Sequence, residues 1–250
     1  MPAFLSPRRC AHALACCLIA VSAGASALRA DDALTPATTS ASDAELDKRL
    51  QFLEERLDAS RLHGQIWYWS WMAIDAGSAV WLGVQAGLND HEDDAVNNAV
   101  NAALGAIGVA DLLLRPLEAR HGANPIRGLP DQSREEKITK VRAAEQLLHD
   151  NAERADDRTS LAMHAGNVAL NGAAGLIVGL AGRPSDGLIT FGAGTVGGVI
   201  NLLTAPWRPA RDWKEYQAFV HGEGGAAKAR FDVALAPLAG GAHLALRLTW

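Results

Sequence analysis

The sequence has little of several residue types that particular functions require. Only three of its 250 residues are cysteines, and all three fall within the first 17 positions. Aromatic residues make up 6% and charged residues 20% of the chain, and acidic residues outnumber basic ones by 28 to 23. This balance argues against a general nucleic-acid binder, which needs a basic face. The chain also lacks a phosphate-binding loop, a dinucleotide fingerprint and a paired-histidine metal motif, so it indicates no enzyme class and no cofactor.

The first thirty residues have the pattern of an export signal. Arg8 and Arg9 precede an apolar run over residues 11–23, and small residues at 25–27 offer a cleavage site, with a second after Ala30. The alternative is an uncleaved N-terminal anchor, although the run is short for a span. Cleavage would remove every cysteine and leave 20 basic against 28 acidic residues. The mature protein would then have no disulfide, thiol nucleophile or thiolate metal site.

Two charged segments follow a polar lead-in at residues 31–42, which we expect to be disordered. Both segments show helical periodicity, and each starts with a serine three residues before a glutamate, as in a capping box. Their apolar stripes are too narrow to be stable alone in water, so we predict that the two helices pack side by side as a stalk. The caps are Ser42–Glu45 and Ser133–Glu136, and the stripes are Leu46, Leu50, Leu53, Leu57 and Ile138, Val141, Leu148, Ala152.

Four further segments are apolar and about 20 residues long, roughly 30 Å as helices, which matches the hydrocarbon core of a bilayer. Short polar loops join them in pairs, and a proline ends each pair, so we expect two helical hairpins. Their glycines would cost about 1 kcal/mol each relative to alanine in water but allow close helix packing in lipid. The segments are 66–88, 95–114, 161–181 and 187–205, and the expected packing glycines are Gly83, Gly87, Gly175, Gly179, Gly194 and Gly198.

The two halves of the chain resemble each other. Residues 108–116 align with residues 198–206 at a constant offset, and Asp75 aligns with Asn167 at nearly the same offset. Each half contains a charged helix followed by an apolar hairpin. The shared order of elements and the shared proline stop favour a parallel duplication over chance similarity.

Aromatic residues flank the apolar segments where the interface of a bilayer would lie. In a four-pass arrangement, the group before the first segment and the group after the fourth lie at the same membrane face. These interfacial candidates are Trp67, Trp69, Trp71, Trp207 and Trp213.

Two observations oppose a membrane location. Asparagine and aspartate within the apolar segments are costly in hydrocarbon. An export signal also places the basic linker and tail outside, which inverts the positive-inside rule. The open alternatives are an outer membrane, where that rule does not operate, a soluble periplasmic bundle, or an N-terminal segment that is not an export signal. We favour membrane association.

The end of the chain has a different pattern. Residues 207–229 read as an amphipathic tail, and residues 230–250 alternate between apolar and other residues around a Gly-Gly pair. Strict alternation predicts a β-hairpin. One hairpin is too small for a membrane barrel, so we expect it to fold back on the helices.

A set of polar residues within the apolar helices is the main candidate site. Ionisable and amide side chains at such depth face the bundle interior, where they either fix helix register or line a polar path. We favour the first role. The set is Asp75, Asp111, Asn167, Asn201 and His164.

Two other patterns are weaker candidates for chemistry. The acidic loop at residues 90–94 offers oxygen ligands for a cation but lacks the spacing of a calcium loop, so we interpret it as a solvated helix cap. Ser160 and His164 share a helix face, but no orienting acid or oxyanion loop accompanies them. We therefore expect no catalytic residues and no bound metal.

Together these patterns predict an all-α membrane-type helical bundle with a C-terminal β-hairpin. Repeat 1 spans residues 43–114, a linker 115–132 and repeat 2 residues 133–206. The expected function is that of an exported cell-envelope protein, a non-enzymatic scaffold or partner-binding subunit. The alternative is a small permeation element. The expected partners are membrane lipid and either another protein or a second copy of the chain, with no nucleic acid.

Overall fold

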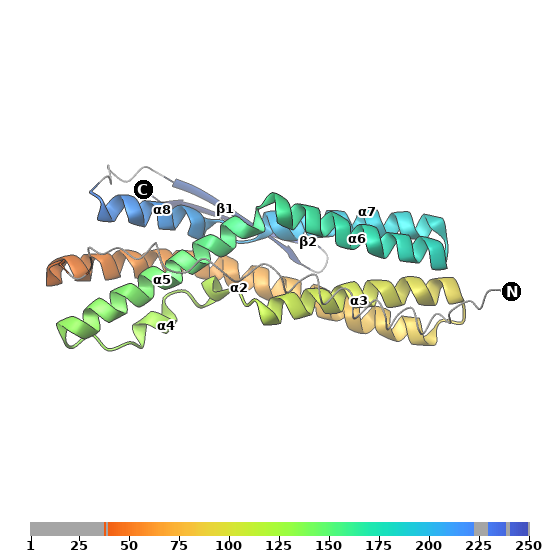
Figure 1. Ribbon diagram of the computed structural model, residues 1–250, viewed down its shortest axis with the longest axis horizontal. Helices are drawn as coiled ribbons and strands as arrows, with labels where there is room; N and C mark the ends of the chain where they lie inside the picture. The colour runs from red at the N-terminus through yellow and green to blue at the C-terminus, as the bar shows by residue number, and fades with distance from the viewer. Residues whose placement is uncertain (1–37, 39, 223–229, 239–240, 250) are drawn as a thin grey trace. The chain divides into compact units, whose positions relative to one another are not determined.

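The computed structural model describes residue 38, residues 40–222, and the backbone of residues 230–238 and 241–249. The predicted signal peptide and most of the predicted lead-in lie outside the described residues. The described part contains six long helices, two short helical turns and two strands (Figure 1). The elements are α2 (Asp43–Leu88), α3 (Glu92–Leu114), η2 (Glu118–His121), α4 (Asn124–Arg127), α5 (Arg134–Arg158), α6 (Leu161–Ala181), α7 (Pro184–Thr204), α8 (Arg208–Val220), β1 (Arg230–Leu238) and β2 (Gly241–Thr249).

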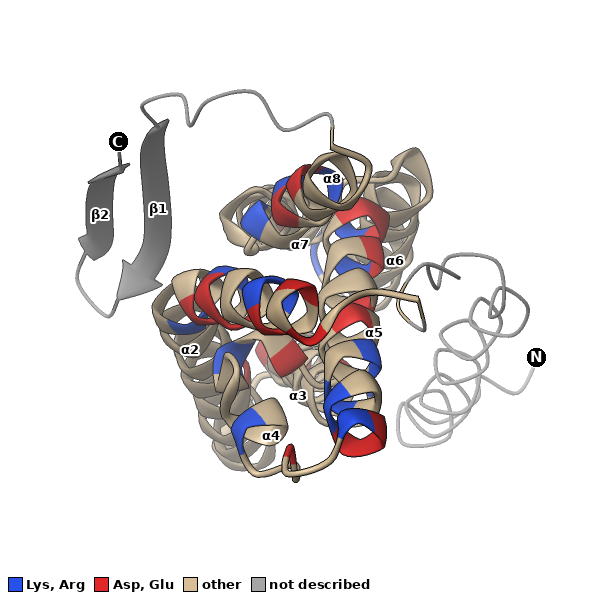
Figure 2. Cartoon of the chain, turned by 90° about the vertical axis from the view of Figure 1, so that its left-hand side faces the viewer, with Lys and Arg blue, Asp and Glu red and all other residues tan. Residues whose placement is uncertain are grey.

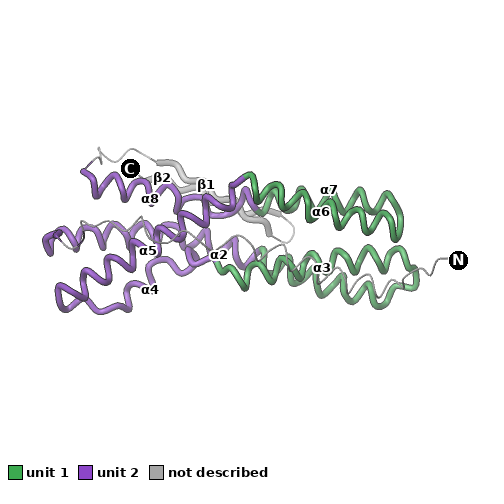
Figure 3. The backbone as a smooth tube through the Cα atoms, in the orientation of Figure 1, with its two compact units in different colours: residues 1–29, 71–116, 161–201 green, residues 30–70, 117–160, 202–250 purple. Residues whose placement is uncertain are grey.

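The chain divides into two compact units (Figure 3). Of the helical residues described, those at 71–116 and 161–201 form unit 1, and those at 40–70, 117–160 and 202–222 form unit 2. Most of the apolar segments therefore fall in unit 1 and the charged helices in unit 2. The long helix α2 contributes its first part to unit 2 and its second part to unit 1.

Unit 1 consists of two antiparallel helical hairpins. The second part of α2 pairs with α3, where Gly105 lies against the backbone of Asp75 and Ala79. Helix α6 pairs with α7 through Gly175 and Gly187, which lie backbone to backbone. An ion pair between Arg183 and Asp94 joins the tips of the two hairpins, so both tips lie at the same end of unit 1.

Three helices of the described part are long and apolar enough to cross a membrane, judged by length and composition. They are α3, α6, and a helical run from Pro184 to Val220 whose apolar part is α7, because α8 carries five charged residues. The first predicted apolar segment is helical but does not meet the same criterion. Asp75, Ser78 and Gln85 lower its hydropathy.

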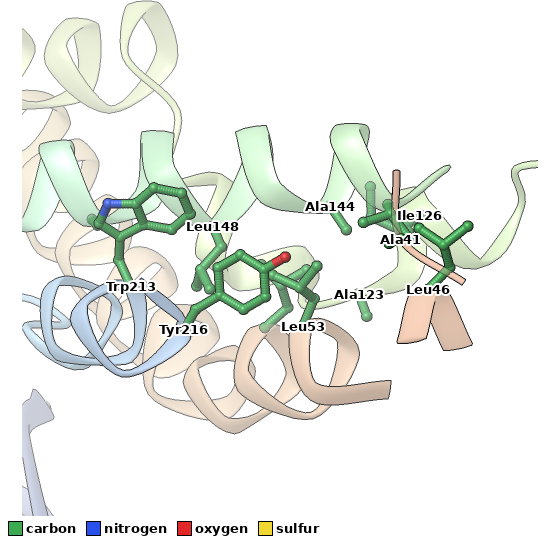
Figure 4. Close-up of a cluster of buried hydrophobic side chains, with 12 residues drawn as sticks. Ala41, Leu46, Leu53, Ala123, Ile126, Ala144, Leu148, Trp213 and Tyr216 are labelled. Atoms are coloured by element: carbon green, nitrogen blue, oxygen red, sulfur yellow. The ribbon is translucent and has the colours of Figure 1, made fainter. Parts of the chain in front are cut away.

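The core of unit 2 confirms the predicted pairing of the two charged helices. Leu53 of α2 and Leu148 of α5 lie in one buried cluster (Figure 4). Leu57 and Val141 belong to the same cluster, and Ile138 packs against it. The two leucines of α2, together with Val141 and Leu148, are each at most 1% exposed. Ion pairs reinforce the α2–α5 interface at its edge, between Lys137 and Asp47 (2.6 Å) and between Arg134 and Asp43.

Unit 2 also contains core elements that the stripe pattern does not predict. Helix α8 inserts Trp213 and Tyr216 beside Leu148 and Leu53 (Figure 4). The predicted linker is folded as well, since Ala123 and Ile126 are buried in the same cluster. The core is therefore built from three helices and a folded connection, because two narrow stripes leave apolar edges that a third helix can cover.

A positive backbone dihedral holds this connection against α2. Gly122 has a φ of 59°, a left-handed conformation that glycine adopts without a steric penalty. Next to it, the backbone N–H of Ala123 donates to Asp58 Oδ1 of α2 (3.0 Å), and Arg127 forms an ion pair with the same carboxylate. These contacts fix the connection on the stalk.

The predicted capping box of α5 is confirmed. Glu136 donates its backbone N–H to Ser133 Oγ (3.2 Å), and Ser133 donates its own to Glu136 Oε2 (3.0 Å). At the start of α2, the backbone N–H of Glu45 reaches Ser42 Oγ at 3.3 Å. Each cap satisfies a backbone group that the first helical turn leaves free.

At the C-terminus, β1 and β2 pair antiparallel in a two-stranded sheet. The register places Arg230 opposite Thr249 and Leu238 opposite Gly241. The backbone pairing is that of a hairpin, as the alternating pattern predicts. The connecting residues 239–240 lie outside the described part.

His63 supplies a test of pH dependence in unit 2. Its Nε2 lies 2.9 Å from the carbonyl oxygen of Thr204 at the end of α7, so the neutral ring donates there. Burial lowers the pKa of His63, with the hydrogen bond to Thr204 opposing the shift. The folded state thus favours the neutral ring. The contribution of His63 to the free energy of unfolding is fully present above the pKa of the unfolded state and is lost as the pH falls below that value.

Thermal unfolding measured between pH 7.5 and pH 5 should show this loss of stability. His63→Gln, which keeps a donor but does not titrate, should lose less stability over the same range, and an equal loss would contradict the assignment.

Candidate functional site

Many large apolar side chains of unit 1 are exposed. Leu180 of α6 and Leu161 are 86% and 84% exposed, and similar side chains lie along all four helices. Proteins folded in water bury such residues, and a continuous exposed apolar surface marks contact with lipid or a partner. The exposed set is Ile74, Val80, Trp81, Val84, Leu88, Leu113, Leu114, Leu161, Val168, Leu176, Leu180, Leu188, Ile189, Phe191, Val196 and Ile200.

The inward side of unit 1 carries amides. Asn101 Nδ2 of α3 donates to the backbone oxygen and to Oδ1 of Asn97, both at 2.9 Å. The Thr190 hydroxyl of α7 donates to Asn97 Oδ1 (3.1 Å) and lies 3.3 Å from Asn101 Nδ2. This network joins a helix of one hairpin to a helix of the other. Such bonds between helices are the usual role of amides in apolar bundles.

A second asparagine pair lies between α6 and α7. Asn171 Nδ2 donates to the backbone oxygen (2.9 Å) and to Oδ1 (2.8 Å) of Asn167, the same arrangement as in α3. Asn167 Nδ2 in turn donates to the Thr195 carbonyl oxygen (3.0 Å). The Oδ1 atoms of Asn171 and Asn167 lie against Gly194 and Gly198, where a Cβ would collide with them. The glycines therefore make room for the amides.

The carboxylate of Asp75 occupies the corresponding place in the first hairpin. It lies against Gly108 of α3, again where a Cβ would collide with it. Asp75 with Gly108 thus matches Asn167 with Gly198, the positions that the sequence alignment equates. Each pair is a polar side chain of the first helix packed on a glycine of the second.

The five predicted polar residues have different surroundings. Asp75 and Asn167 lie in separate hairpin interfaces, and no hydrogen bond of the described residues joins them. Asp111 forms an ion pair with Arg115 one turn away. His164 and Asn201 are half-buried, and within the described part His164 makes no hydrogen bond to the amides. The structure adds Asn97, Asn101, Asn171 and Thr190, which the sequence reasoning missed although Asn-x-x-x-Asn recurs in both helices.

The predicted packing glycines fall into three groups. Gly175, Gly194 and Gly198 are in close contact, and a Cβ at Gly175 would lie 2.6 Å from the Gly187 carbonyl oxygen. Gly83 and Gly179 have ordinary van der Waals neighbours, and Gly87 faces open space. Gly105 and Gly187 belong with the close group.

The predicted interfacial tryptophans divide by burial. Trp69 and Trp207 are exposed, so for these two residues the interfacial role stays a prediction. Trp67 is fully buried under the Arg158 guanidinium, at 4.5 Å from its ring centroid. Trp71 and Trp213 are also buried, and Trp213 packs against His149 and Tyr216. These three rings are core side chains instead, because the aromatic surface is more stable packed than exposed.

One cluster in unit 2 has the residue types of a metal site. His149, Asp150 and Glu153 of α5 lie close together. His149 directs Nδ1 toward Asp150 and Nε2 toward Glu153, each at 3.8 Å, so no single ring nitrogen faces both carboxylates. A shared ion would need one nitrogen and both oxygens to converge. We interpret the cluster as polar side chains of one helix that lie close together without a shared ligand.

Apart from the C-terminal strands, the described part of the chain is all-α, with three candidate membrane helices and amides inside unit 1. No family model matches the sequence, and neither a curated protein nor a solved structure matches it.

Proposed function

We propose that this chain is an exported cell-envelope protein without catalytic activity. Unit 1 lies in a membrane as two hairpins, and unit 2 is a charged helical domain in water that binds a protein partner. The observation that carries the proposal is the opposite burial pattern of the two units. Unit 1 exposes many large apolar side chains and has glycines and amides at its helix interfaces, whereas the core of unit 2 is built from leucines and other apolar side chains.

The charged faces of unit 2 are the proposed partner-binding surface. Helices α5 and α8 and the first part of α2 carry many charged residues of both signs (Figure 2). Lys48 and Glu55 of α2, and Arg142 and Glu153 of α5, are exposed on the sides that face away from the core. A mixed-charge surface favours a partner of complementary charge and gives specificity more than affinity.

We further propose that unit 1 arose by duplication. The equivalent contacts of Asp75 with Gly108 and of Asn167 with Gly198 support this view. The duplicated unit is then a hairpin whose first helix presents a polar side chain to a glycine of the second helix. A parallel repeat keeps both tips at one end, in keeping with the Arg183–Asp94 ion pair.

A permeation element is the second candidate, and the amide interior favours it. Such a path needs polar groups that can exchange their partners with a solute. Asn97, Asn101, Asn167 and Asn171 already hydrogen-bond within and between helices. The contacts therefore support the scaffold role better, with the amides as the groups that fix helix register.

Arginine scanning of the exposed apolar surface tests the membrane proposal. Leu176 of α6 and Leu62 of α2 are similarly exposed, at 66% and 62%, but only Leu176 lies in an apolar helix of unit 1. Leu176→Arg places a charge inside the proposed span, five residues before α6 ends, which costs at most the roughly 2.5–3.5 kcal/mol of a charge at a span centre, whereas Leu62→Arg leaves the charge in water. After an alkaline wash and sedimentation, we expect the wild type and Leu62→Arg in the membrane pellet and a smaller share of Leu176→Arg there.

Two outcomes would contradict the proposal. Wild-type protein that stays in the aqueous fraction without detergent would favour the soluble bundle instead. Equal sedimentation of Leu176→Arg and Leu62→Arg would show that the α6 surface does not face lipid.

A further inference from the structure

Glu145 of α5 is a completely buried carboxylate in unit 2 that membrane anchoring does not explain. It accepts a hydrogen bond from the Tyr216 hydroxyl of α8. The Thr38 hydroxyl, also fully buried, lies 3.5 Å from both of its oxygens. Residue 38 and helix α8 thus meet on one side chain.

The residues that shield the Glu145 carboxylate from water affect the stability of unit 2. A buried carboxylate is costly unless hydrogen bonds and a cation compensate it. Burial and Glu145 raise the pKa of the Tyr216 hydroxyl, and Arg49 of α2, 5% exposed, opposes this rise. The Nε atom of Arg49 lies 3.2 Å from Glu45 Oε1. Among the described residues, the hydroxyls of Tyr216 and Thr38 face the carboxylate from two separate segments.

The segment that carries Thr38 lies on the bundle like a strap; we define the strap as residue 38 with residues 40–42. Ala41 is part of the buried core cluster, and its carbonyl oxygen accepts from Arg134 Nη2 of α5 at 2.6 Å. Ser42 caps α2. The strap is therefore attached to α5 and α2 independently of Glu145.

We propose that the strap controls how firmly α8 is docked, with Glu145 as the shared contact that couples them. With the strap in place, water is excluded from Glu145 and the Tyr216 hydroxyl donates to a dry carboxylate. With the strap displaced, water reaches the carboxylate, and the bond from Tyr216 loses most of its net value. Displacement of the strap thus loosens α8, the helix that follows α7 in the sequence. The coupling does not depend on a membrane location.

Hydrogen exchange of the full chain in detergent tests this coupling. Thr38→Val removes one hydroxyl and keeps the shape, so we expect amide exchange in α8 to rise about fivefold to tenfold. Coupling is reciprocal, so Tyr216→Phe should raise exchange at the start of α2, next to the strap. Thr139→Val is the matched control, because this exposed threonine of α5 bonds only to its own helix at the Glu135 carbonyl oxygen.

The exchange rates of the variants either support or overturn the coupling between the strap and α8. Faster α8 exchange in Thr38→Val, with Thr139→Val at the wild-type rate, supports the strap. A different pair of results overturns the proposal: amide exchange of α8 in Thr38→Val stays within twofold of the wild type, but Tyr216→Phe accelerates it. In that case Glu145 holds α8 without help from the strap. Equal acceleration in Thr38→Val and Thr139→Val also overturns it. Unchanged circular dichroism of each variant shows that it folds.

Discussion

Replacing Leu53 and Leu57 together by aspartate should unfold unit 2. Both side chains are at most 1% exposed and lie in the cluster that joins α2, α5 and α8. Each substitution removes about 1.5–3 kcal/mol of apolar burial and adds a charge without a partner, which costs several kcal/mol more. The sum is comparable to the whole stability of a small domain, about 5–15 kcal/mol. Loss of the cooperative thermal transition, followed by circular dichroism, measures the effect.

The control uses exposed positions of the same helix. Gln51→Asp with Leu62→Asp adds the same two charges to α2 on its exposed side, and Leu62 is 62% exposed. Surface substitutions of this kind change stability by about 0.5 kcal/mol or less. If the Leu53 and Leu57 variant melts at the same temperature as this control, the shared stalk core is refuted.

Alanine substitutions of two glycines of α7 should have opposite signs. At Gly187 a Cβ would meet the backbone of Gly179 at 2.7 Å, and backbone cannot move aside as a side chain can. We expect Gly187→Ala to separate α6 from α7 and to cost about 1–3 kcal/mol. At Gly192 a Cβ meets nothing within 4 Å. Gly192→Ala should therefore gain up to about 1 kcal/mol from helix propensity.

The wild type and the two glycine variants are compared in the same detergent. Denaturation by increasing sodium dodecyl sulfate, followed by tryptophan fluorescence, reports the order of stability. The expected order is Gly192→Ala, wild type, Gly187→Ala. A Gly187→Ala variant as stable as the wild type would show that the close backbone contact of α6 and α7 does not exist in the folded protein.

The sequence predicts a good part of the fold, and the reason differs between elements. Serine and glutamate spacing predicts the start of α5, because a cap depends on residues within one helical turn. The narrow leucine stripe of α2 predicts its partner, because α5 carries the other narrow stripe in the chain. Proline and polar loops mark the ends of the apolar helices for the same local reason.

The candidate site is predicted only in part. Asp75 and Asn167 stand out because a polar residue within an apolar run is unusual, and both lie on a glycine of the next helix. Asn97 and Asn171 belong to the same interior, but their role depends on Thr190 and on glycines about 20 or more residues away. The burial of Trp67 and Trp213 could not be predicted from the sequence either. An aromatic residue near the end of an apolar segment is compatible with a membrane interface and with a protein core.

The sequence by itself determined the length and polarity of each helix, the caps, the hairpin order and the narrow stripes, because these depend on neighbours within a few residues. Only the tertiary structure decided that α8 and the 117–127 connection complete the stalk core, that apolar side chains in unit 1 point outward, and that Thr38, Glu145 and Tyr216 meet. Periodicity states that a helix has an apolar face but not what covers it. The choice between a neighbouring helix and solvent or lipid rests on packing between segments that are distant in the chain.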